Sequence, residues 1–400
     1  MSGASRSRKV LLSAYACEPG KGSEPGAGWL WALAAARTSQ VWVLTRANNR
    51  AAIEADPASR AASLHFVYVD LPRALVRWKR PGRAIRLYYV LWQLLALRTA
   101  RRLQAREGFD VVHHVTFANV WLPALAAFVD APFVLGPVGG GQRVARAHYA
   151  ALGGTGAAKE LALRAARPLA RANPIVRLAW RRATLILLNN EETRQVLPRA
   201  ARKKALLRPG QCVDGIEPAP ATDPTAAPTA VYAGRLHRFK GLELALHALA
   251  LRPEWRLVLA GSGPDEARLR RLARMLGLDA RVEFCGRLPQ QELWRLMASC
   301  DAFVLPSLKE GGGFAAFEAA ALGLPVVAFD AGGPAAVARS LPAARFELVP
   351  PAASARGLAT ALGRLGKRTQ PGTPIAAGPA ALAVALESIY ERATAGASDA

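Results

Sequence analysis

Short apolar runs recur along the chain, separated by glycine-containing loops and by longer segments that mix apolar and charged residues. A short, continuous apolar run bounded by turn residues is typical of a strand buried on both faces, as in a parallel sheet. The longer mixed segments favour helices. The pattern therefore predicts an α/β protein, with strands near residues 9–15, 41–44, 109–117, 132–135, 184–188, 230–233, 256–260 and 302–305.

The size of the chain indicates more than one domain. It has 400 residues, of which 52% are hydrophobic and 20% charged, and this suffices for two globular domains with full cores. A stretch rich in Pro, Ala and Thr interrupts the alternation after residue 208. We expect an N-terminal Rossmann-like domain over residues 1–208, a linker over 209–228 and a C-terminal domain over 229–378.

The N-terminus has a basic stretch followed by an apolar run that ends at Cys17, which superficially suggests a signal or lipoprotein sequence. The run covers only residues 10–16 and is shorter than a typical signal core, so we expect the first buried strand instead. The cysteines are scattered without a CxxC pair, which argues against a structural zinc site or a disulfide framework and favours a reducing cytoplasm. They are Cys17, Cys212, Cys285 and Cys300.

The loop and predicted helix over residues 306–320 carry two carboxylates, Glu310 and Glu318. With a helix that begins near Phe314, Glu318 lies about one helical turn inside it. The glycines of the loop let backbone N–H groups approach closely, and a helix N-terminus favours an anion such as a diphosphate. The alternative is a glycine-rich turn before a core helix, with two solvated glutamates.

A second loop of this kind covers residues 234–241, after a short strand and before a predicted helix. Arg235 and Lys240 are cations with no acid between them, suited to phosphate oxygens, although a solvated basic turn has the same appearance. A glycine loop at residues 17–28 also joins a strand to a helix. It is not a nucleotide P-loop, because no Gly-Lys-Ser/Thr closes it.

The segments "GRLHRFKGL", "LAGSGPDEARLRRLA", "VEFCGRLPQQEL", "CDAFVLPS" and "EGGGFAAFEAAALGLPVVAFDAGG" together resemble the C-terminal domain of glycosyltransferase family 4. The five motifs occur in the order of that family over residues 230–333. Members are retaining enzymes of the GT-B fold. The resemblance implies two Rossmann-like domains facing across a cleft, with a C-terminal helix, about residues 379–400, that returns to the N-terminal domain.

The resemblance also implies roles for individual residues. Glu318 would hold the nucleotide ribose and Glu310 would contact the transferred sugar. The loop of Gly312, Gly313, Phe314 and Ala315 departs from the usual glycine spacing of the family, and Ala335 and Ala336 stand where an acid is common. By position, Arg235 and Lys240 match the family's residues that contact the donor phosphates. Gly286, Arg287 and Leu288 match the region that lines the base, and Gly22 and Ser23 stand where the family's first loop faces the donor diphosphate.

His113 and His114 are the remaining candidate catalytic residues, at the end of the predicted strand 109–117. Family members often place a cleft histidine after such a stretch, and here the spacing is compressed by one residue. Adjacent strand residues point to opposite faces, so only one of the two faces the cleft unless the strand has already ended. The alternative for either is a buried, hydrogen-bonded histidine.

The implied activity is transfer of a sugar, with retention, from a nucleotide diphosphate sugar of the UDP or GDP type to a saccharide or lipid-linked saccharide, in cell-surface polysaccharide or glycolipid synthesis. We expect neither a cofactor nor a metal. Two alternatives remain open: a sugar-nucleotide 2-epimerase on a similar scaffold, which needs no acceptor, and a basic nucleic-acid-binding protein.

The net charge of +24 is concentrated in the first half of the chain. Residues 1–210 hold 33 Lys and Arg against 11 Asp and Glu. No helix-turn-helix, zinc-finger or aromatic RNA-binding signature accompanies this charge, so an anionic membrane surface is a better partner than nucleic acid. An arginine-rich proteome that merely solvates its helices explains part of the excess but not the asymmetry.

Residues 73–106 carry ten basic residues and no acid around an apolar, aromatic centre at 87–97 that is too short to span a bilayer. This fits either a helix that lies among lipid headgroups or a core helix with a cationic outer face. A lipid-linked acceptor would place the protein in the cytoplasm, peripherally at the inner face of the plasma membrane. The ten are Arg73, Arg77, Lys79, Arg80, Arg83, Arg86, Arg98, Arg101, Arg102 and Arg106.

Overall fold

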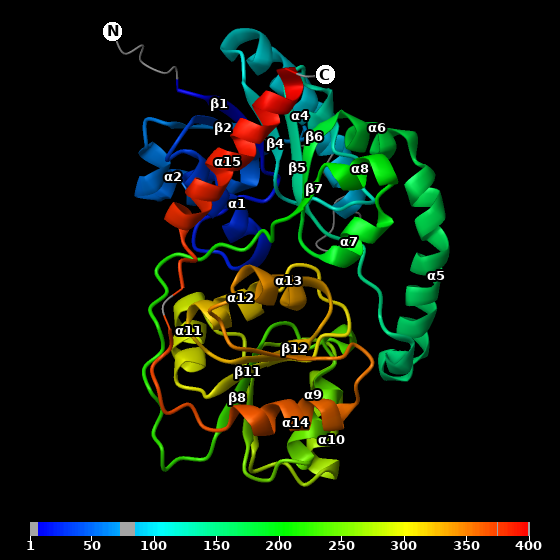
Figure 1. Cartoon of the computed structure of the whole chain (residues 1–400), viewed down its shortest axis with the longest axis vertical. Coiled ribbons are helices and arrows are strands. Elements are labelled where there is room, and N and C mark those ends of the chain that lie inside the picture. Colours follow the sequence, from blue (N-terminus) through cyan, green and yellow to red (C-terminus); the bar gives the residue numbers. More distant parts are fainter. Residues whose placement is uncertain (1–6, 73–84, 374, 399–400) are drawn as a thin grey trace.

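The computed structural model describes residues 7–72, 85–373 and 375–398 and contains two parallel β-sheets, one above the other in Figure 1. The N-terminal sheet has seven strands in the order β3-β2-β1-β4-β5-β6-β7, and the C-terminal sheet has six in the order β10-β9-β8-β11-β12-β13. Adjacent strands in both sheets pair in parallel. The predicted fold class, two Rossmann-like domains, is confirmed.

Hydrophobic runs form the strands. The N-terminal sheet comprises β1 (Lys9–Ser13), β2 (Gln40–Arg46), β3 (Leu64–Val69), β4 (Val111–His114), β5 (Phe133–Val138), β6 (Ala183–Leu188) and β7 (Ala205–Leu207). The C-terminal sheet comprises β8 (Thr229–Ala233), β9 (Arg256–Ala260), β10 (Val282–Gly286), β11 (Ala302–Leu305), β12 (Val326–Phe329) and β13 (Phe346–Val349).

Helices connect the strands. In the N-terminal domain they are α1 (Ser23–Ala35), α2 (Arg50–Ala55), α4 (Ile85–Glu107), α5 (Gly153–Ala172), α6 (Pro174–Arg182), α7 (Glu191–Val196) and α8 (Arg199–Lys203). In the C-terminal domain they are α9 (Leu242–Ala250), α10 (Glu266–Met275), α11 (Gln290–Ala298), α12 (Phe314–Ala321), α13 (Gly332–Ser340) and α14 (Ala355–Leu365), and α15 (Pro379–Ser398) follows.

The direction in which the strand order grows changes once in each sheet. In the N-terminal sheet this happens between β1 and β4, and in the C-terminal sheet between β8 and β11. Ligands of open α/β sheets bind at such switch points, outside the carboxyl ends of the strands, because the loops there diverge and leave a crevice. The topology therefore directs attention to the loops that follow these four strands.

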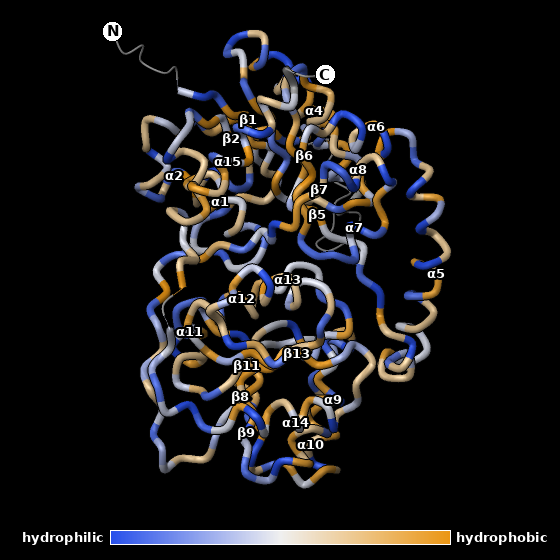
Figure 2. Tube along the Cα trace, in the orientation of Figure 1, coloured by the Kyte–Doolittle hydropathy of each residue, from blue (hydrophilic) through white to orange (hydrophobic). Residues whose placement is uncertain are grey.

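The N-terminal sheet is buried on both faces, and Figure 2 shows its apolar strands inside the molecule. One face packs against α1 and α15, where Trp31 and Tyr390 are fully buried. The other face packs against α4 and α6, where Trp92 and Trp180 are buried. Covering both faces explains why these strands read as continuous apolar runs rather than as alternating patterns.

The last helix, α15, leaves the C-terminal domain and packs beside α1 of the N-terminal domain (Figure 1). Leu382, Leu386 and Tyr390 lie in the same buried cluster as Trp31. This confirms the predicted return of the C-terminal helix. The segment 208–228 between β7 and β8 contains no helix or strand.

Some strands differ from the prediction. β4 covers only Val111–His114, and the residues that follow it turn away to line the space between the domains. β3, β7, β10, β12 and β13 were not predicted as strands. β3, β10 and β13 lie at sheet edges and are only partly buried, so they lack a continuous apolar run, whereas β7 and β12 are apolar but only three and four residues long. An edge strand has neighbours on one side only, and its sequence is correspondingly more polar.

The helix α4 settles one of the alternatives left open above. Tyr88, Tyr89 and Trp92 are buried in the domain core, whereas Leu94 and Arg98 on the outer face are exposed. The structure thus shows a core helix whose outer face is cationic. Arg73, Arg77, Lys79, Arg80 and Arg83 fall outside the described residues. In the part of the chain that is described, no helix is long and apolar enough to cross a membrane.

Candidate active site at the interdomain cleft

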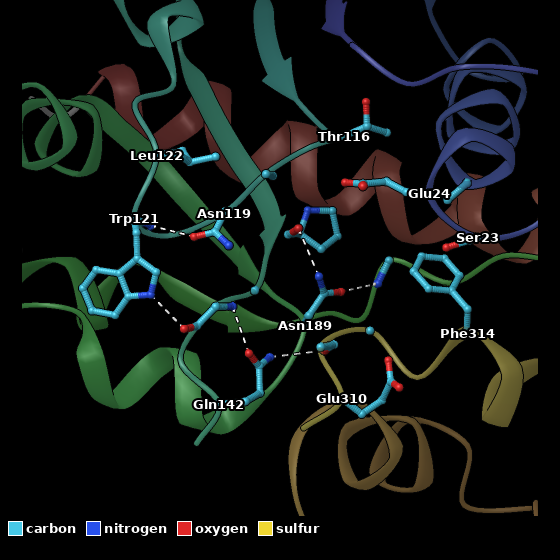
Figure 3. Close-up of a pocket in the computed structure, with 18 of the residues that line it drawn as sticks. Ser23, Glu24, Thr116, Asn119, Trp121, Leu122, Gln142, Asn189, Glu310 and Phe314 are labelled. Atoms are coloured by element: carbon cyan, nitrogen blue, oxygen red, sulfur yellow. Dashed lines mark hydrogen bonds between the residues drawn. The ribbon is translucent and has the colours of Figure 1, made fainter. Parts of the chain in front are cut away.

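A cavity of about 680 Å³ lies between the two domains, at the switch points of both sheets (Figure 3). We call it the cleft cavity. The N-terminal domain supplies the start of α1, the loops after β4, β5 and β6, and one side of α5, and the C-terminal domain supplies the glycine-rich loop before α12. Its principal polar lining residues are Ser23, Glu24, Thr116, Asn119, Gln142, Arg167, Asn189, Lys309 and Glu310.

A second cavity of about 540 Å³ adjoins the first and is called the side cavity here. It lies between the loop before α1 and helix α11, and Glu318 forms part of its wall. Ser23, Ala27 and Phe314 line both cavities. The start of α12 thus stands between two spaces, with Glu310 on one and Glu318 on the other.

The loop before α12 places the Glu310 carboxylate in the cleft cavity. Its Oε2 lies 2.5 Å from Lys240 Nζ, and the Gly313 backbone N–H donates to Oε1 at 3.4 Å. Gly313 has a left-handed φ of +70°, and a Cβ there would lie 2.8 Å from the Gly333 backbone. The prediction of a tight glycine turn beside a carboxylate agrees with this geometry.

Helix α12 begins at Phe314, as predicted, and has no side-chain cap. The first backbone hydrogen bond of the helix runs from Phe317 to Gly313. The N–H groups of Phe314 and Ala315 are therefore left for another acceptor, and the helix dipole adds a partial positive charge. This end of α12 suits a phosphate group.

The N-terminal domain holds the same loop from the other side. Asn190 Nδ2 donates to the Gly311 carbonyl at 2.9 Å, Gln142 Nε2 donates to it at 3.4 Å, and Glu192 accepts from the Gly332 N–H at 2.7 Å. Lys309 pairs at 2.6 Å with Glu160 of α5, which is fully buried. The position of Glu310 therefore depends on both domains.

Glu318 is 8% exposed, on the second turn of α12. Its Oε2 accepts hydrogen bonds from Gln290 Nε2 at 3.3 Å and Trp294 Nε1 at 3.4 Å. Burial raises the pKa of this carboxyl to about 7, and the two hydrogen bonds oppose the rise. An ionised Glu318 receives hydrogen bonds from Gln290 and Trp294, and hydroxyl donors from a ligand would stabilise it further.

The two predicted phosphate-binding cations occupy different environments. Lys240 ends the 3-10 turn Arg238–Lys240 and is held by Glu310. Arg235 is exposed on the loop after β8 and lines neither cavity. Lys240 lines neither cavity either, but its ion pair with Glu310 connects it to the acidic loop.

His113 and His114 require a correction. The Nε2–H of His113 donates to the Gly136 carbonyl, its Nδ1 is hydrogen-bonded to Tyr390 Oη, and the two ring nitrogens of His114 are hydrogen-bonded to Tyr89 Oη and Ser13 Oγ. Both rings are almost completely buried, and neither lines a cavity. They point to opposite faces of β4, as strand geometry requires, but both faces are covered by helices. Burial lowers the pKa of His113 to about 3 and that of His114 to about 4, so both remain neutral.

The remaining predicted donor residues lie near the side cavity. Gly22 and Ser23 line it, and Ser23 adopts a left-handed φ of +62° at the start of α1. Gly286, Arg287 and Leu288 do not line it, but the residues that follow them do, namely Pro289, Gln290 and Trp294.

Several cavity residues were not identified from the sequence. Glu24 accepts a hydrogen bond from the Phe117 N–H, and burial raises the pKa of its carboxyl. Phe117 itself has a left-handed φ of +57°. The available signal was position: polar residues directly after the ends of β4, β5 and β6 face the crevice. Those missed are Glu24, Thr116, Asn119, Trp121 and Asn189.

No cluster of three or more His, Cys, Asp or Glu side chains that suits a metal ion occurs among the described residues.

Part of the chain matches a known family. Residues 217–365 match the sequence profile of the family Glycosyl transferases group 1. D-inositol 3-phosphate glycosyltransferase of Corynebacterium efficiens is 38% identical over 126 residues, which are 29% of this chain and 30% of that protein. A GDP-mannose-dependent phosphatidylinositol monomannoside mannosyltransferase of Corynebacterium glutamicum is 38% identical over 92 residues, 21% of this chain and 24% of that protein. The chain thus matches less than a third of the length of these curated relatives.

Solved structures match over nearly the whole length and show the fold. Sucrose-phosphate synthase from Thermosynechococcus elongatus has a TM-score of 0.59 at 19% identity, covering 97% of this chain and 94% of that one. HepE of Anabaena in complex with UDP and glucose has a TM-score of 0.55 at 18% identity, covering 98% and 100%. WaaG, a glycosyltransferase involved in lipopolysaccharide biosynthesis, has a TM-score of 0.51 at 15% identity, covering 96% and 94%.

Proposed function

We propose, on the premise that this chain belongs through residues 217–365 to the glycosyl transferases group 1 family and has the GT-B fold, that it is a retaining glycosyltransferase. It transfers a sugar from a nucleotide diphosphate sugar, of the UDP or GDP type, to a saccharide or lipid-linked saccharide. The product belongs to cell-surface polysaccharide or glycolipid synthesis. The observation that carries the proposal is the placement of Glu310 and Glu318 on two adjoining cavities, on either side of the N-terminus of α12.

In the proposed arrangement, the nucleotide of the donor lies in the side cavity and its sugar lies in the cleft cavity. Glu318 accepts hydrogen bonds from the ribose hydroxyls in the side cavity, and Gln290 and Trp294 hold its carboxylate in place. The diphosphate lies against the free N–H groups of α12 and beside Gly22 and Ser23. The sugar then enters the cleft cavity, where Glu310 meets its hydroxyl groups.

The reaction breaks the bond between the anomeric carbon and the diphosphate oxygen and forms a bond from the same carbon to an acceptor hydroxyl oxygen. The proton of that hydroxyl passes to the departing phosphate. Negative charge on the diphosphate grows as the bond breaks, and the N–H groups of α12 together with Lys240 stabilise it. Lys240 must then share its ammonium between Glu310 and the phosphate.

Closure of the cleft by both domains excludes water, which would otherwise hydrolyse the donor. The hydrogen bonds from Asn190 and Gln142 to the Gly311 carbonyl support this role, because they fix the Glu310 loop only when the domains are together. Acceptor binding on the N-terminal side and donor binding on the C-terminal side thereby become coupled.

A peripheral position on an anionic membrane surface, on the cytoplasmic side, forms part of the proposal. It is supported by the charge of the first half of the chain and by the exposed arginines of α4, which are Arg98, Arg101, Arg102 and Arg106. Each cation close to an anionic surface contributes on the order of 1 kcal/mol of binding free energy.

The test is incubation with UDP- and GDP-sugars, each with and without saccharide acceptors, with released nucleotide and labelled product as readouts. We expect one donor to release nucleotide and to transfer its sugar when an acceptor is present. Product with the sugar epimerised, formed without acceptor, identifies a sugar-nucleotide epimerase instead and overturns the proposal.

A further inference from the structure

The cleft cavity has four charged lining residues, Glu24, Arg167, Lys309 and Glu310. Three of them have partners in the structure. Glu24 accepts from a backbone N–H, Lys309 pairs with Glu160, and Glu310 pairs with Lys240. Arg167 has no carboxylate within ion-pair distance among the described residues, so it stands out as a cation in need of a counter-charge.

The guanidinium of Arg167 is oriented but not satisfied. Its Nη2 donates to the Gln142 carbonyl, whereas its buried Nη1 has no hydrogen-bond partner. Burial lowers the pKa of Arg167, and the charges of Arg143 and Arg164 lower it further, whereas the Glu160 carboxylate raises it. A buried donor without a partner costs free energy that a ligand oxygen can recover.

An aromatic ring lies beside this guanidinium. The Arg167 Cζ is 6.0 Å from the ring centroid of Trp121, and Trp121 is fixed by hydrogen bonds from its Nε1 to the Gly140 carbonyl and from its N–H to Asn119. Figure 3 shows Trp121 at the far side of the pocket from Ser23 and Phe314. An indole face next to apolar groups of α5 offers a platform for a sugar ring.

The position of Arg167 relative to the donor is fixed through Gln142. The Gln142 carbonyl accepts from Arg167, and its side chain donates to the Gly311 carbonyl next to Glu310. The unpartnered Nη1 of Arg167 therefore lies on the acceptor side of the same cavity in which the donor sugar is proposed to lie.

We propose that Arg167 recognises the acceptor, and that this acceptor is an anionic saccharide with an oxyanion, a phosphate or a carboxylate, next to the sugar that receives the new bond. The inference rests on the proposed glycosyltransferase function and specifies its acceptor class. The planar guanidinium matches a phosphate or carboxylate with paired hydrogen bonds, and the enclosed position strengthens the interaction. Trp121 supports the sugar ring, and Arg167 pairs with the anion.

The experiment uses the full chain saturated with UDP or GDP, so that the donor phosphate site is filled. Three probes are titrated by calorimetry: a neutral methyl hexoside, the matching methyl hexuronide and the matching hexose 1-phosphate. We expect at least one anionic probe to bind ten-fold or more tightly than the neutral one, and the pair distinguishes carboxylate from phosphate.

Three variants localise the effect. Arg167→Gln is expected to abolish the preference for the anionic probe, and Arg167→Lys to retain part of it. Arg171→Gln, one turn further along α5 and exposed, removes the same charge outside the cavity and is expected to leave the preference unchanged. Thermal unfolding and nucleotide affinity of each variant check that the fold and the donor site remain intact.

The proposal is overturned if wild type binds anionic and neutral probes equally, or if Arg167→Gln with intact nucleotide binding keeps the anionic preference. Failure of wild type to bind any nucleotide is a different result, because it removes the proposed function itself. The readouts are thus distinguishable.

Discussion

At the scale of single residues, Glu318 and Glu310 have the same chemistry in different surroundings. Glu318 is buried against Trp294 and Gln290, and Glu310 is paired with Lys240 at the edge of a larger space. The two roles proposed for them, ribose binding and sugar binding, therefore predict different kinetic consequences of substitution.

Glu318→Ala is expected to weaken nucleotide binding by about ten-fold or more, because hydrogen bonds to a charged acceptor contribute about 1.5–3 kcal/mol each. Glu310→Ala is expected to lower kcat by a larger factor than it changes nucleotide affinity, because the nucleotide does not reach it. Calorimetry with UDP and GDP and steady-state kinetics measure the two effects. Equal losses of affinity and turnover in both variants would contradict the division.

The raised pKa of Glu318 predicts a pH dependence of stability. In the folded protein the carboxyl has a pKa of about 7, above its unfolded value, so the folded state binds more protons between pH 4.5 and 7. Stability therefore falls as pH rises through this window. Glu318→Gln removes the titration, and its melting temperature relative to wild type should be higher at pH 8 than at pH 5. An offset that does not change with pH would show that Glu318 is already ionised at acid pH.

At the scale of elements, α5 projects from the N-terminal domain and runs along the side of the C-terminal domain (Figure 1). It places Glu160 against Lys309 and Arg167 beside Gln142. Neither contact follows from the pattern of α5 itself, where a lone acid among basic residues reads as a solvated charge. The buried Glu160 carboxylate instead helps to hold the loop before α12.

Breaking the ion pair between Glu160 and Lys309 from one side should destabilise the protein, because an unpaired charge is then left partly buried. Single variants Glu160→Leu and Lys309→Met are each expected to lower the melting temperature, by the equivalent of a few kcal/mol for the fully buried acid. The double variant, which leaves no charge, should recover much of the loss. Additive losses in the double variant, measured by thermal unfolding, would argue against a direct pairing.

At the scale of the whole molecule, no residue of α4 lines the cleft cavity or the side cavity. Membrane binding through the cationic outer face of α4 and catalysis can therefore be tested with different variants. Changing Arg98, Arg101 and Arg102 to Ser should reduce sedimentation with anionic vesicles and leave turnover of a soluble acceptor unchanged. Salt should weaken wild-type binding as the reach of the charges shortens.

The matched control changes the same number of charges in the C-terminal domain, at Arg270, Arg271 and Arg274 of α10, which are also exposed. This variant should sediment like wild type. If both triple variants sediment equally with anionic vesicles, or if wild type does not sediment at low salt, the membrane proposal fails and a soluble acceptor is favoured.

The sequence by itself determined the class of fold and the place of the acidic loop. Buried parallel strands require continuous apolar runs, and a glycine turn before a helix requires residues such as Gly313 at positive φ, so both are visible in the order of the residues. Phe314 as the first residue of α12 and the return of α15 to the N-terminal domain were predicted correctly.

Only the tertiary structure decided which polar side chains face the cleft. His113 and His114 looked suitable by position, but helices cover both faces of β4, and burial depends on neighbours that are distant in the sequence. Conversely, Glu24 and Arg167 gave no local signal, because their surroundings come from several loops and from α5. Strands and turns follow from short-range patterns, whereas a site between two domains is formed by contacts that no short segment specifies.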